Sequence, residues 1–111
     1  MDKIQKYQIV VTAEFYQDLR RKSDFITANY HDRTLARTWS KRLLAEIQRD
    51  LSAFPEKYPL YQGRRQKDDE IRLLLYRNDV VMYSVSNQEK CVYLHGVCTK
   101  GMDIDGYLEK S

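Results

Sequence analysis

The chain has 111 residues, of which 42% are hydrophobic and 32% are charged, and its formal net charge is +3. This size and composition predict one soluble globular domain over residues 1–111, and they exclude a disordered or repetitive chain. The first residues lack the apolar core of a secretory signal, and no apolar run approaches the ~20 residues that cross a bilayer. We therefore expect a cytoplasmic protein without a membrane partner.

Residues 6–12 alternate in hydrophobicity, which predicts a first strand. Thr12 is a suitable N-cap for the helix that follows. Apolar residues then recur at helical spacing, at Phe15, Leu19, Ile26 and Tyr30. The Asn, His and Asp residues between Asn29 and Arg33 predict the end of this helix.

A second helix is predicted by an apolar stripe with steps of three or four residues, formed by Leu35, Trp39, Leu43, Ile47, Leu51 and Phe54. We interpret this stripe as core and Trp39 as a packing residue. Pro55 ends the helix. Another face carries a like-charged ladder, Arg33, Arg37 and Lys41. Such a ladder costs a few tenths of a kcal/mol per pair in an isolated helix, which suits a partner that supplies negative charge.

Three short strands are predicted in the C-terminal half, over residues 71–76, 80–85 and 90–98. Turns at Asn78-Asp79 and at residues 86–89 join them. Strict alternation in the last strand places Val92, Leu94, Gly96 and Cys98 on one face and Cys91, Tyr93, His95 and Val97 on the other. Residues 103–108 form a last helical turn or a short tail.

This order of elements predicts an α+β fold. A small, mainly antiparallel four-stranded sheet carries an N-terminal helical hairpin packed on one face, in the order β-α-α-β-β-β. The hairpin can cover only one face of the sheet. The other face, or the groove beside it, therefore stays free for a partner.

No metal motif is present in the sequence. Cys91 and Cys98 have no matching Cys or His cluster, so we expect unbridged thiols that pack as small apolar groups. The run Asp68-Asp69-Glu70 has no partner motif and is typical of a solvated loop. We expect no metal and no cofactor.

Basic residues are unevenly distributed. Between Arg20 and Arg49, eight Lys or Arg residues oppose three acids. A second basic group flanks the start of the strands, at Arg64, Arg65, Lys67, Arg72 and Arg77. This asymmetry suits an anionic partner, either nucleic acid or an acidic protein segment. A merely solvated surface explains any single one of these charges equally well.

Several segments together resemble a known family: the opening Val11-Thr-Ala-Glu-Phe-Tyr-Gln-Asp-Leu19, the helix end Leu51-Ser-Ala-Phe-Pro55, the strand pair 71–75 and 80–85, and the closing residues 92–103. In their order and spacing they resemble the RelE/ParE superfamily of toxins from bacterial type II toxin-antitoxin systems. The resemblance covers nearly the whole chain. It implies a toxin held inactive by a cognate antitoxin. The oligomeric state is left open, and a homodimer is one of the alternatives.

The resemblance implies two targets. The long helical hairpin resembles the ParE branch, which inhibits DNA gyrase, and we favour this branch. The alternative is RelE-like cleavage of mRNA at the ribosome without a metal. A further alternative is an inactive relative or a nucleic-acid-binding module.

Metal-free RNA cleavage needs cations that stabilise the charged phosphorane and groups that carry protons. The candidates are the cations Arg72, Arg77 and Lys100, with His95 or Tyr83 as proton carriers. In the nucleases of this family, the functional residues lie mainly where the third strand begins and after the last strand. Here those places hold Asp79-Val80 and Lys100-Gly101-Met102, without the expected arginines. For binding a partner or nucleic acid, the candidates are Arg33, Arg37, Lys41, Arg64, Arg65 and Lys67.

Overall fold

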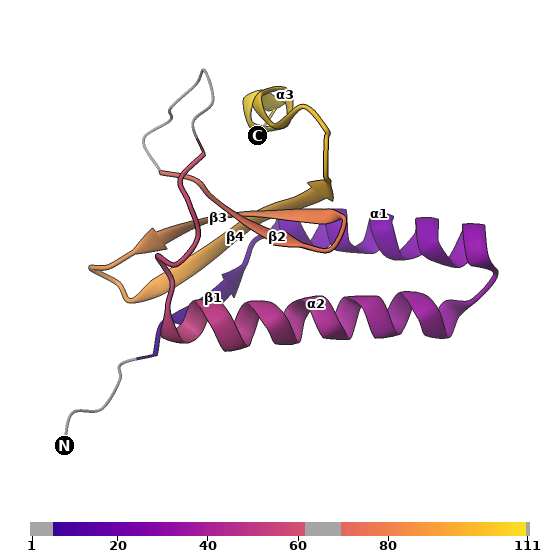
Figure 1. Ribbon diagram of the computed structural model, residues 1–111, viewed down its shortest axis with the longest axis horizontal. Helices are drawn as coiled ribbons and strands as arrows, with labels where there is room; N and C mark the ends of the chain where they lie inside the picture. The colour runs from indigo at the N-terminus through magenta and orange to yellow at the C-terminus, as the bar shows by residue number, and fades with distance from the viewer. Residues whose placement is uncertain (1–5, 62–69, 111) are drawn as a thin grey trace.

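The computed structural model describes residues 6–61 and 70–110, with the backbone alone at residues 109 and 110. Its elements are, in chain order, β1 (Gln8–Val11), α1 (Ala13–Tyr30), α2 (Arg33–Ala53), β2 (Arg72–Tyr76), β3 (Asp79–Ser86), β4 (Cys91–Thr99) and α3 (Ile104–Lys110). The strands form one sheet in the order β1-β4-β3-β2 (Figure 1). The pairs β2–β3 and β3–β4 are antiparallel, whereas β1 is parallel to β4. The predicted α+β fold with a mainly antiparallel sheet is confirmed.

Local side-chain hydrogen bonds set the ends of the two long helices. Thr12 caps α1 by accepting a hydrogen bond from the Phe15 N–H at 3.2 Å, as predicted. His31 ends α1 in a left-handed conformation, with a φ of 51°. The Asp32 carboxylate then caps α2 by accepting hydrogen bonds from the N–H groups of Thr34 and Leu35. The chain therefore reverses within two residues and makes a tight hairpin.

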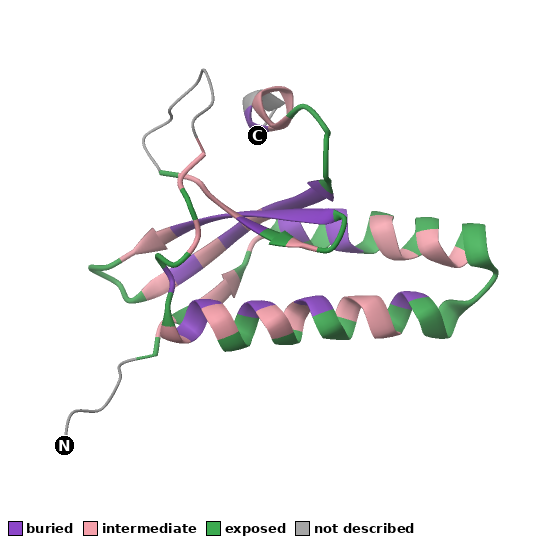
Figure 2. Ribbon diagram, in the orientation of Figure 1, coloured by how far each residue is buried: buried purple, intermediate pink, exposed green. Residues whose placement is uncertain are grey.

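The main core lies between the helical hairpin and one face of the sheet (Figure 2). Its buried members are Phe15, Leu19, Leu43, Ile47, Leu51, Leu74, Val81, Tyr83, Val92, Leu94 and Val97. Each fully buried side chain of this size contributes about 1.5–3 kcal/mol relative to an exposed one. The predicted stripe on α2 is confirmed for Leu43, Ile47 and Leu51.

The two ends of that stripe are not core. Leu35 is 42% exposed and Phe54 is 62% exposed, while Trp39 is half-buried against the core. For Leu35 the reason is visible in Figure 1: the hairpin extends past the end of the sheet, so no strand covers the start of α2. Phe54 is the C-cap residue at the other end of α2. None of the helices in the described part of the chain is long and apolar enough to cross a membrane.

A β-bulge in β4 changes the predicted alternation. Met82 pairs with Gly96 and Tyr83 pairs with Leu94, so His95 is an extra residue between them. Val97 consequently packs in the main core beside Leu94, whereas Cys98 lies in a cluster on the opposite face. The predicted faces were wrong for the residues that follow the bulge. The predicted turn at Asn78-Asp79 also lies one residue earlier, at Arg77 and Asn78.

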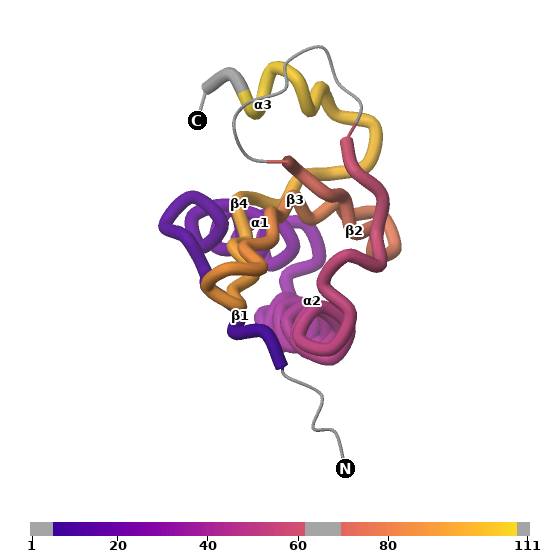
Figure 3. The backbone as a smooth tube through the Cα atoms, turned by 90° about the vertical axis from the view of Figure 1, so that its left-hand side faces the viewer, coloured from indigo at the N-terminus to yellow at the C-terminus, as the bar shows by residue number. Residues whose placement is uncertain are grey.

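The second face of the sheet is partly covered by α3. Figures 1 and 3 place α3 on the side of the sheet away from α2. Leu108 is buried there against Val80, Met82 and Cys98, with the half-buried Tyr107 beside them. The expectation that this face stays free is therefore wrong for the part under α3. The groove beside the sheet, the other predicted opening, is present.

Candidate partner-binding groove

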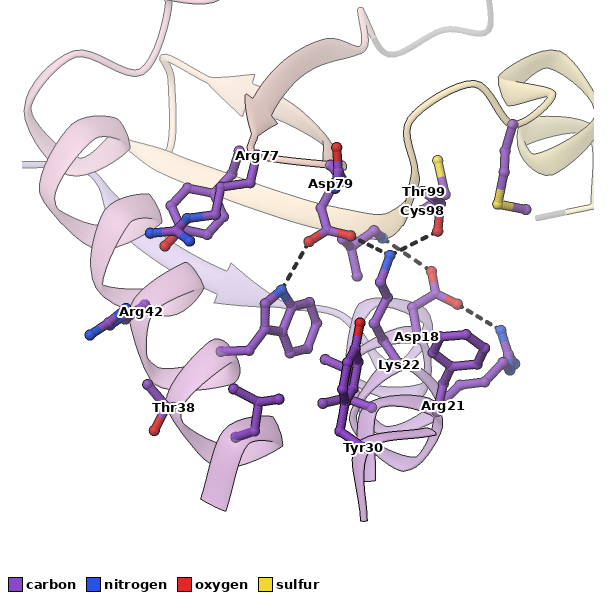
Figure 4. A pocket seen from close by; sticks show the side chains of 18 of the residues that line it. Asp18, Arg21, Lys22, Tyr30, Thr38, Arg42, Arg77, Asp79, Cys98 and Thr99 are labelled. Atoms are coloured by element: carbon purple, nitrogen blue, oxygen red, sulfur yellow. Dashed lines mark hydrogen bonds and ion pairs between the residues drawn. The ribbon is translucent and has the colours of Figure 1, made fainter. Parts of the chain in front are cut away.

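A groove of about 710 Å³ lies between the distal half of the hairpin and the end of the sheet (Figure 4). One side comes from α1 and α2, and the other from the turn between β2 and β3, the end of β4 and the residues around α3. Its apolar lining consists of Phe25, Ile26, Tyr30, Leu35, Trp39, Tyr76, Val97, Met102 and Tyr107. We call this feature the distal groove.

Several of these apolar side chains are unusually exposed. Phe25 is 61%, Tyr30 65%, Leu35 42% and Met102 57% exposed. Single exposed apolar residues are ordinary on protein surfaces, but a group that lines one groove is typical of an interaction site. The distal groove is therefore the strongest candidate for a binding site in the described part of the chain.

The floor of the groove holds a neutralised acid. Asp79 is only 4% exposed. Its carboxylate forms an ion pair with the Lys22 ammonium and accepts a hydrogen bond of 2.9 Å from the Trp39 indole N–H. Lys22 also donates to the Thr99 hydroxyl at 2.8 Å. This network joins α1, α2, β3 and β4, so it holds the Trp39 indole in place at the base of the groove.

A second buried acid, Asp18, lines the groove. Asp18 of α1 accepts a hydrogen bond of 3.1 Å from the Val97 N–H, beyond the point where β1 stops pairing with β4. Asp18 also pairs with Arg21 at 3.1 Å and accepts a hydrogen bond from the Tyr107 hydroxyl. Burial and this bond to Asp18 raise the pKa of Tyr107, so its hydroxyl stays a donor. Asp18 thereby provides a hydrogen-bond acceptor for one N–H group on the edge of β4 that β1 leaves uncovered.

The rim of the groove is basic. Three guanidinium groups line it, from Arg21 on α1, Arg42 on α2 and Arg77 in the turn after β2. The Arg77 guanidinium lies 5.6 Å from the centre of the Tyr76 ring. The two acids of the groove, Asp18 and Asp79, already have cationic partners. An occupant that combines apolar side chains with carboxylates therefore fits this surface best.

The predicted nuclease residues do not converge on one site. The Arg72 guanidinium donates to the carbonyl oxygens of Tyr58 at 2.7 Å and Glu56 at 3.3 Å, so it holds the loop after α2. Arg77 lies at the other end of β2, about 16 Å further along a strand. The Lys100 N–H donates to Asn78 O at 2.7 Å, which brings Lys100 close to Arg77 and leaves Arg72 apart.

The two predicted proton carriers lie on opposite faces of the sheet. Tyr83 is fully buried in the main core, and its hydroxyl donates to Pro55 O at 2.8 Å. His95 is the bulge residue, and its Nε2 lies 2.7 Å from the Ser84 hydroxyl on the other face.

Burial raises the pKa of the Cys98 thiol. In residues 6–61 and 70–110, no group of three or more His, Cys, Asp or Glu side chains is placed to hold a metal ion.

The predicted binding residues on α2 lie away from the distal groove. Arg33, Arg37 and Lys41 line a shallow depression of about 490 Å³ between the two helices. No residue of this depression also lines the groove. The other predicted binding residues, Arg64, Arg65 and Lys67, lie outside the described residues.

Sequence reasoning missed the apolar lining of the groove. Phe25 and Met102 were assigned no role, Tyr30 was assigned to the apolar spacing of the first helix, and Leu35 was assigned to the core stripe of the second. One signal was available: the apolar residues of both helices continue into the turns next to the hairpin bend, at the end of α1 and the start of α2, where the strands are too few to cover them all.

Comparisons with known proteins support the fold. No protein-family model matches the chain, and no curated protein matches it in sequence. Among solved structures, the chain is similar to one from the RelBE2 toxin-antitoxin complex of Mycobacterium tuberculosis, with a TM-score of 0.57 and 17% sequence identity. The similarity covers 92% of this chain and 100% of that one. The protein therefore shares the fold of that chain, in agreement with the RelE/ParE-like fold predicted from the sequence.

Proposed function

We propose that this chain is the toxin of a type II toxin-antitoxin system, and that the distal groove holds an acidic, amphipathic segment of its antitoxin. The observation that carries the proposal is the group of exposed apolar side chains beneath a rim of three guanidinium groups. A similar fold occurs in a complex described as a toxin with its antitoxin.

The chemistry of the groove describes its occupant. Burial of Phe25, Tyr30, Leu35 and Met102 by a partner contributes about 1.5–3 kcal/mol for each side chain that becomes fully buried. Carboxylates along the edge of the partner segment reach Arg21, Arg42 and Arg77, where charge-assisted hydrogen bonds add orientation. Such a segment is disordered alone and becomes ordered in the groove.

For the target we favour DNA gyrase, inhibited by binding and without a chemical step. The separation of Arg72 from Arg77 and Lys100 supports this preference, because Arg72 is committed to two loop carbonyls and is not free to clamp a phosphate. The projecting hairpin offers a large surface for binding an enzyme instead (Figure 1).

Cleavage of mRNA at the ribosome is the second candidate. The contact between Ser84 and His95 favours it, since a half-buried imidazole held by a hydroxyl can carry a proton. In this case Arg77 and Lys100 supply the cations. Both candidates place the protein in the cytoplasm.

Expression of the chain alone, and together with a small acidic protein encoded beside it, tests the toxin role. We expect growth arrest in the first case and growth in the second. Unimpaired growth without the acidic protein contradicts the proposal. A supercoiling assay with purified gyrase then separates the targets: gyrase inhibition with intact mRNA supports the first, whereas new mRNA ends that disappear in His95→Ala support the second.

A further inference from the structure

A second surface of the hairpin is chemically different from the distal groove. Its cations Arg33, Arg37 and Lys41 recur at every fourth residue of α2 and are all exposed. Ser23 and Thr27 of α1 and Ser40 of α2 line the same shallow depression. We call this surface the outer basic face. We propose that it binds the phosphodiester backbone of a nucleic acid, an activity separate from the antitoxin site.

The spacing of the cations fits a regular polyanion. Two steps of four residues span about 12 Å of helix axis. Over that length, one strand of duplex DNA carries about three or four phosphates. Three cations in a row on one helix therefore face a similar number of phosphates without any rearrangement of the backbone.

The remaining residues of this surface favour a nucleic acid over an acidic protein. The depression is lined by Ser, Thr, Ala, Arg, Lys and one Asp, and by no large apolar side chain. Protein interfaces need an apolar or aromatic centre, which is absent from this lining. Phosphate groups, in contrast, are bound mainly by Arg and Lys with hydroxyl groups beside them, as found here.

The cations are also available for an external partner. Within residues 6–61 and 70–110, none of Arg33, Arg37 and Lys41 forms an ion pair. Like charges four residues apart repel one another in the free helix. Bound phosphates reduce this repulsion. Binding is therefore favoured both by the new contacts and by the reduced repulsion between the cations. Asp24 is the one acid in the depression and opposes the binding of phosphate.

The outer basic face and the distal groove share no residue. The groove is lined by Arg21, Lys22 and Phe25 on α1, whereas the outer basic face takes Ser23, Asp24 and Thr27 from the same helix. Positions two residues apart differ by about 200° around a helix axis, so these two sets lie on different sides of α1. An occupant of the groove therefore leaves the outer basic face open.

Fluorescence anisotropy over a salt series tests the proposal. The probes are a labelled DNA duplex, a single-stranded DNA and a single-stranded RNA of equal length. The test variant is Arg33→Gln, Arg37→Gln, Lys41→Gln. The control variant, Arg49→Gln, Lys57→Gln, Lys90→Gln, changes net charge equally at exposed positions outside both surfaces.

We expect the test variant to reduce the slope of log K against log salt by about 2.7 on duplex DNA and about 2 on a single strand. The control variant should change the slope by less than about one unit, and Asp24→Asn should tighten binding. The relative strength of the three probes identifies the preferred nucleic acid. Because neutralisation removes repulsion, the test variant should melt at the same or a higher temperature, which separates lost binding from lost folding.

Three results overturn the proposal. One is the absence of binding to all three probes at low salt. Another is an equal loss in the test and control variants, which shows that only net charge matters. The last is displacement of nucleic acid by polyglutamate at equal charge concentration, which assigns the surface to an acidic protein.

Discussion

Tyr107 crosses the backbone of β4 at Gly96, where a Cβ atom would lie 2.6 Å from Tyr107 Cζ and 2.9 Å from Asp18 Oδ2. The Tyr107 hydroxyl uses this passage to donate a hydrogen bond to Asp18. Helix α3 is thereby fastened to α1 around the open edge of β4. Only glycine leaves the necessary space, because the nearest atoms belong to the Tyr107 side chain, whose hydroxyl is hydrogen-bonded to Asp18.

We therefore expect Gly96→Ala to lower the free energy of unfolding by about 1–3 kcal/mol, the usual cost of overpacking. Urea denaturation measures this change. Gly106→Ala is the matched control, since its Cβ would meet only the exposed Asp103 side chain, which can rotate away. In a Tyr107→Ala background the cost of Gly96→Ala should shrink. An unchanged cost there means that Tyr107 is not its cause.

Helical periodicity identified the correct face of α2 but not the extent of its cover. Leu35 and Leu43 belong to the same apolar stripe, yet Leu43 is fully buried and Leu35 is 42% exposed. The stripe reports which side of the helix faces the sheet, whereas the position of the sheet along the helix depends on β3 and β4, which are distant in sequence. The groove arises from this offset.

The two buried acids show a second limit of sequence reasoning. In the sequence, Asp18 and Asp79 resemble ordinary surface acids at a helix and a turn. Their partners Tyr107 and Lys22 are brought to them only by the tertiary fold. The bulge at His95 is likewise a matter of pairing between strands, so strict alternation gave the wrong faces after it.

Loss of Asp79 should reveal how much the floor of the groove depends on its ion pair. In Asp79→Ala, Lys22 remains largely buried without its carboxylate partner, and the Trp39 indole loses its acceptor. Removal of one partner from such a pair costs about 3–5 kcal/mol. Adding Lys22→Met should recover part of the loss, with a coupling energy of about 0.5–3 kcal/mol from urea unfolding of the four species. Additive effects contradict the pairing.

Alkaline pH should weaken the fold through Tyr83. Burial raises the pKa of Tyr83 to about 12, so the folded state favours the neutral phenol. The stabilisation of the folded state by the neutral Tyr83 phenol is complete below pH 10. It declines between pH 10 and about pH 12, because Tyr83 ionises at lower pH in the unfolded chain than in the folded one. Tyr83→Phe loses the hydrogen bond to Pro55 O, at a cost of about 1 kcal/mol. Plots of unfolding free energy against pH for the wild-type protein and Tyr83→Phe should therefore converge as the pH rises. Parallel plots from pH 8 upward contradict this assignment.

Arg72 should prove structural even where no RNA is present. Its guanidinium donates to two carbonyls of the loop after α2, and charged hydrogen bonds contribute about 1.5–3 kcal/mol each. We expect Arg72→Gln to lower the free energy of unfolding by about 2 kcal/mol. Arg77→Gln, at the exposed end of the same strand, should cost less than about 1 kcal/mol. Equal stabilities of the two variants would return Arg72 to the list of candidate catalytic groups.

Phe25 and Phe54 form a natural pair for testing the distal groove. They are 61% and 62% exposed, but only Phe25 lines the groove. Since both side chains are mainly in water, Phe25→Ala and Phe54→Ala should each change stability by no more than about 0.5 kcal/mol. An aromatic residue that fills an interface typically contributes about 2 kcal/mol or more to binding. Phe25→Ala should therefore weaken antitoxin binding about 30-fold in calorimetric titration, whereas Phe54→Ala should leave it unchanged. Equal affinities of the two variants place the antitoxin elsewhere, even if the chain proves to be a toxin.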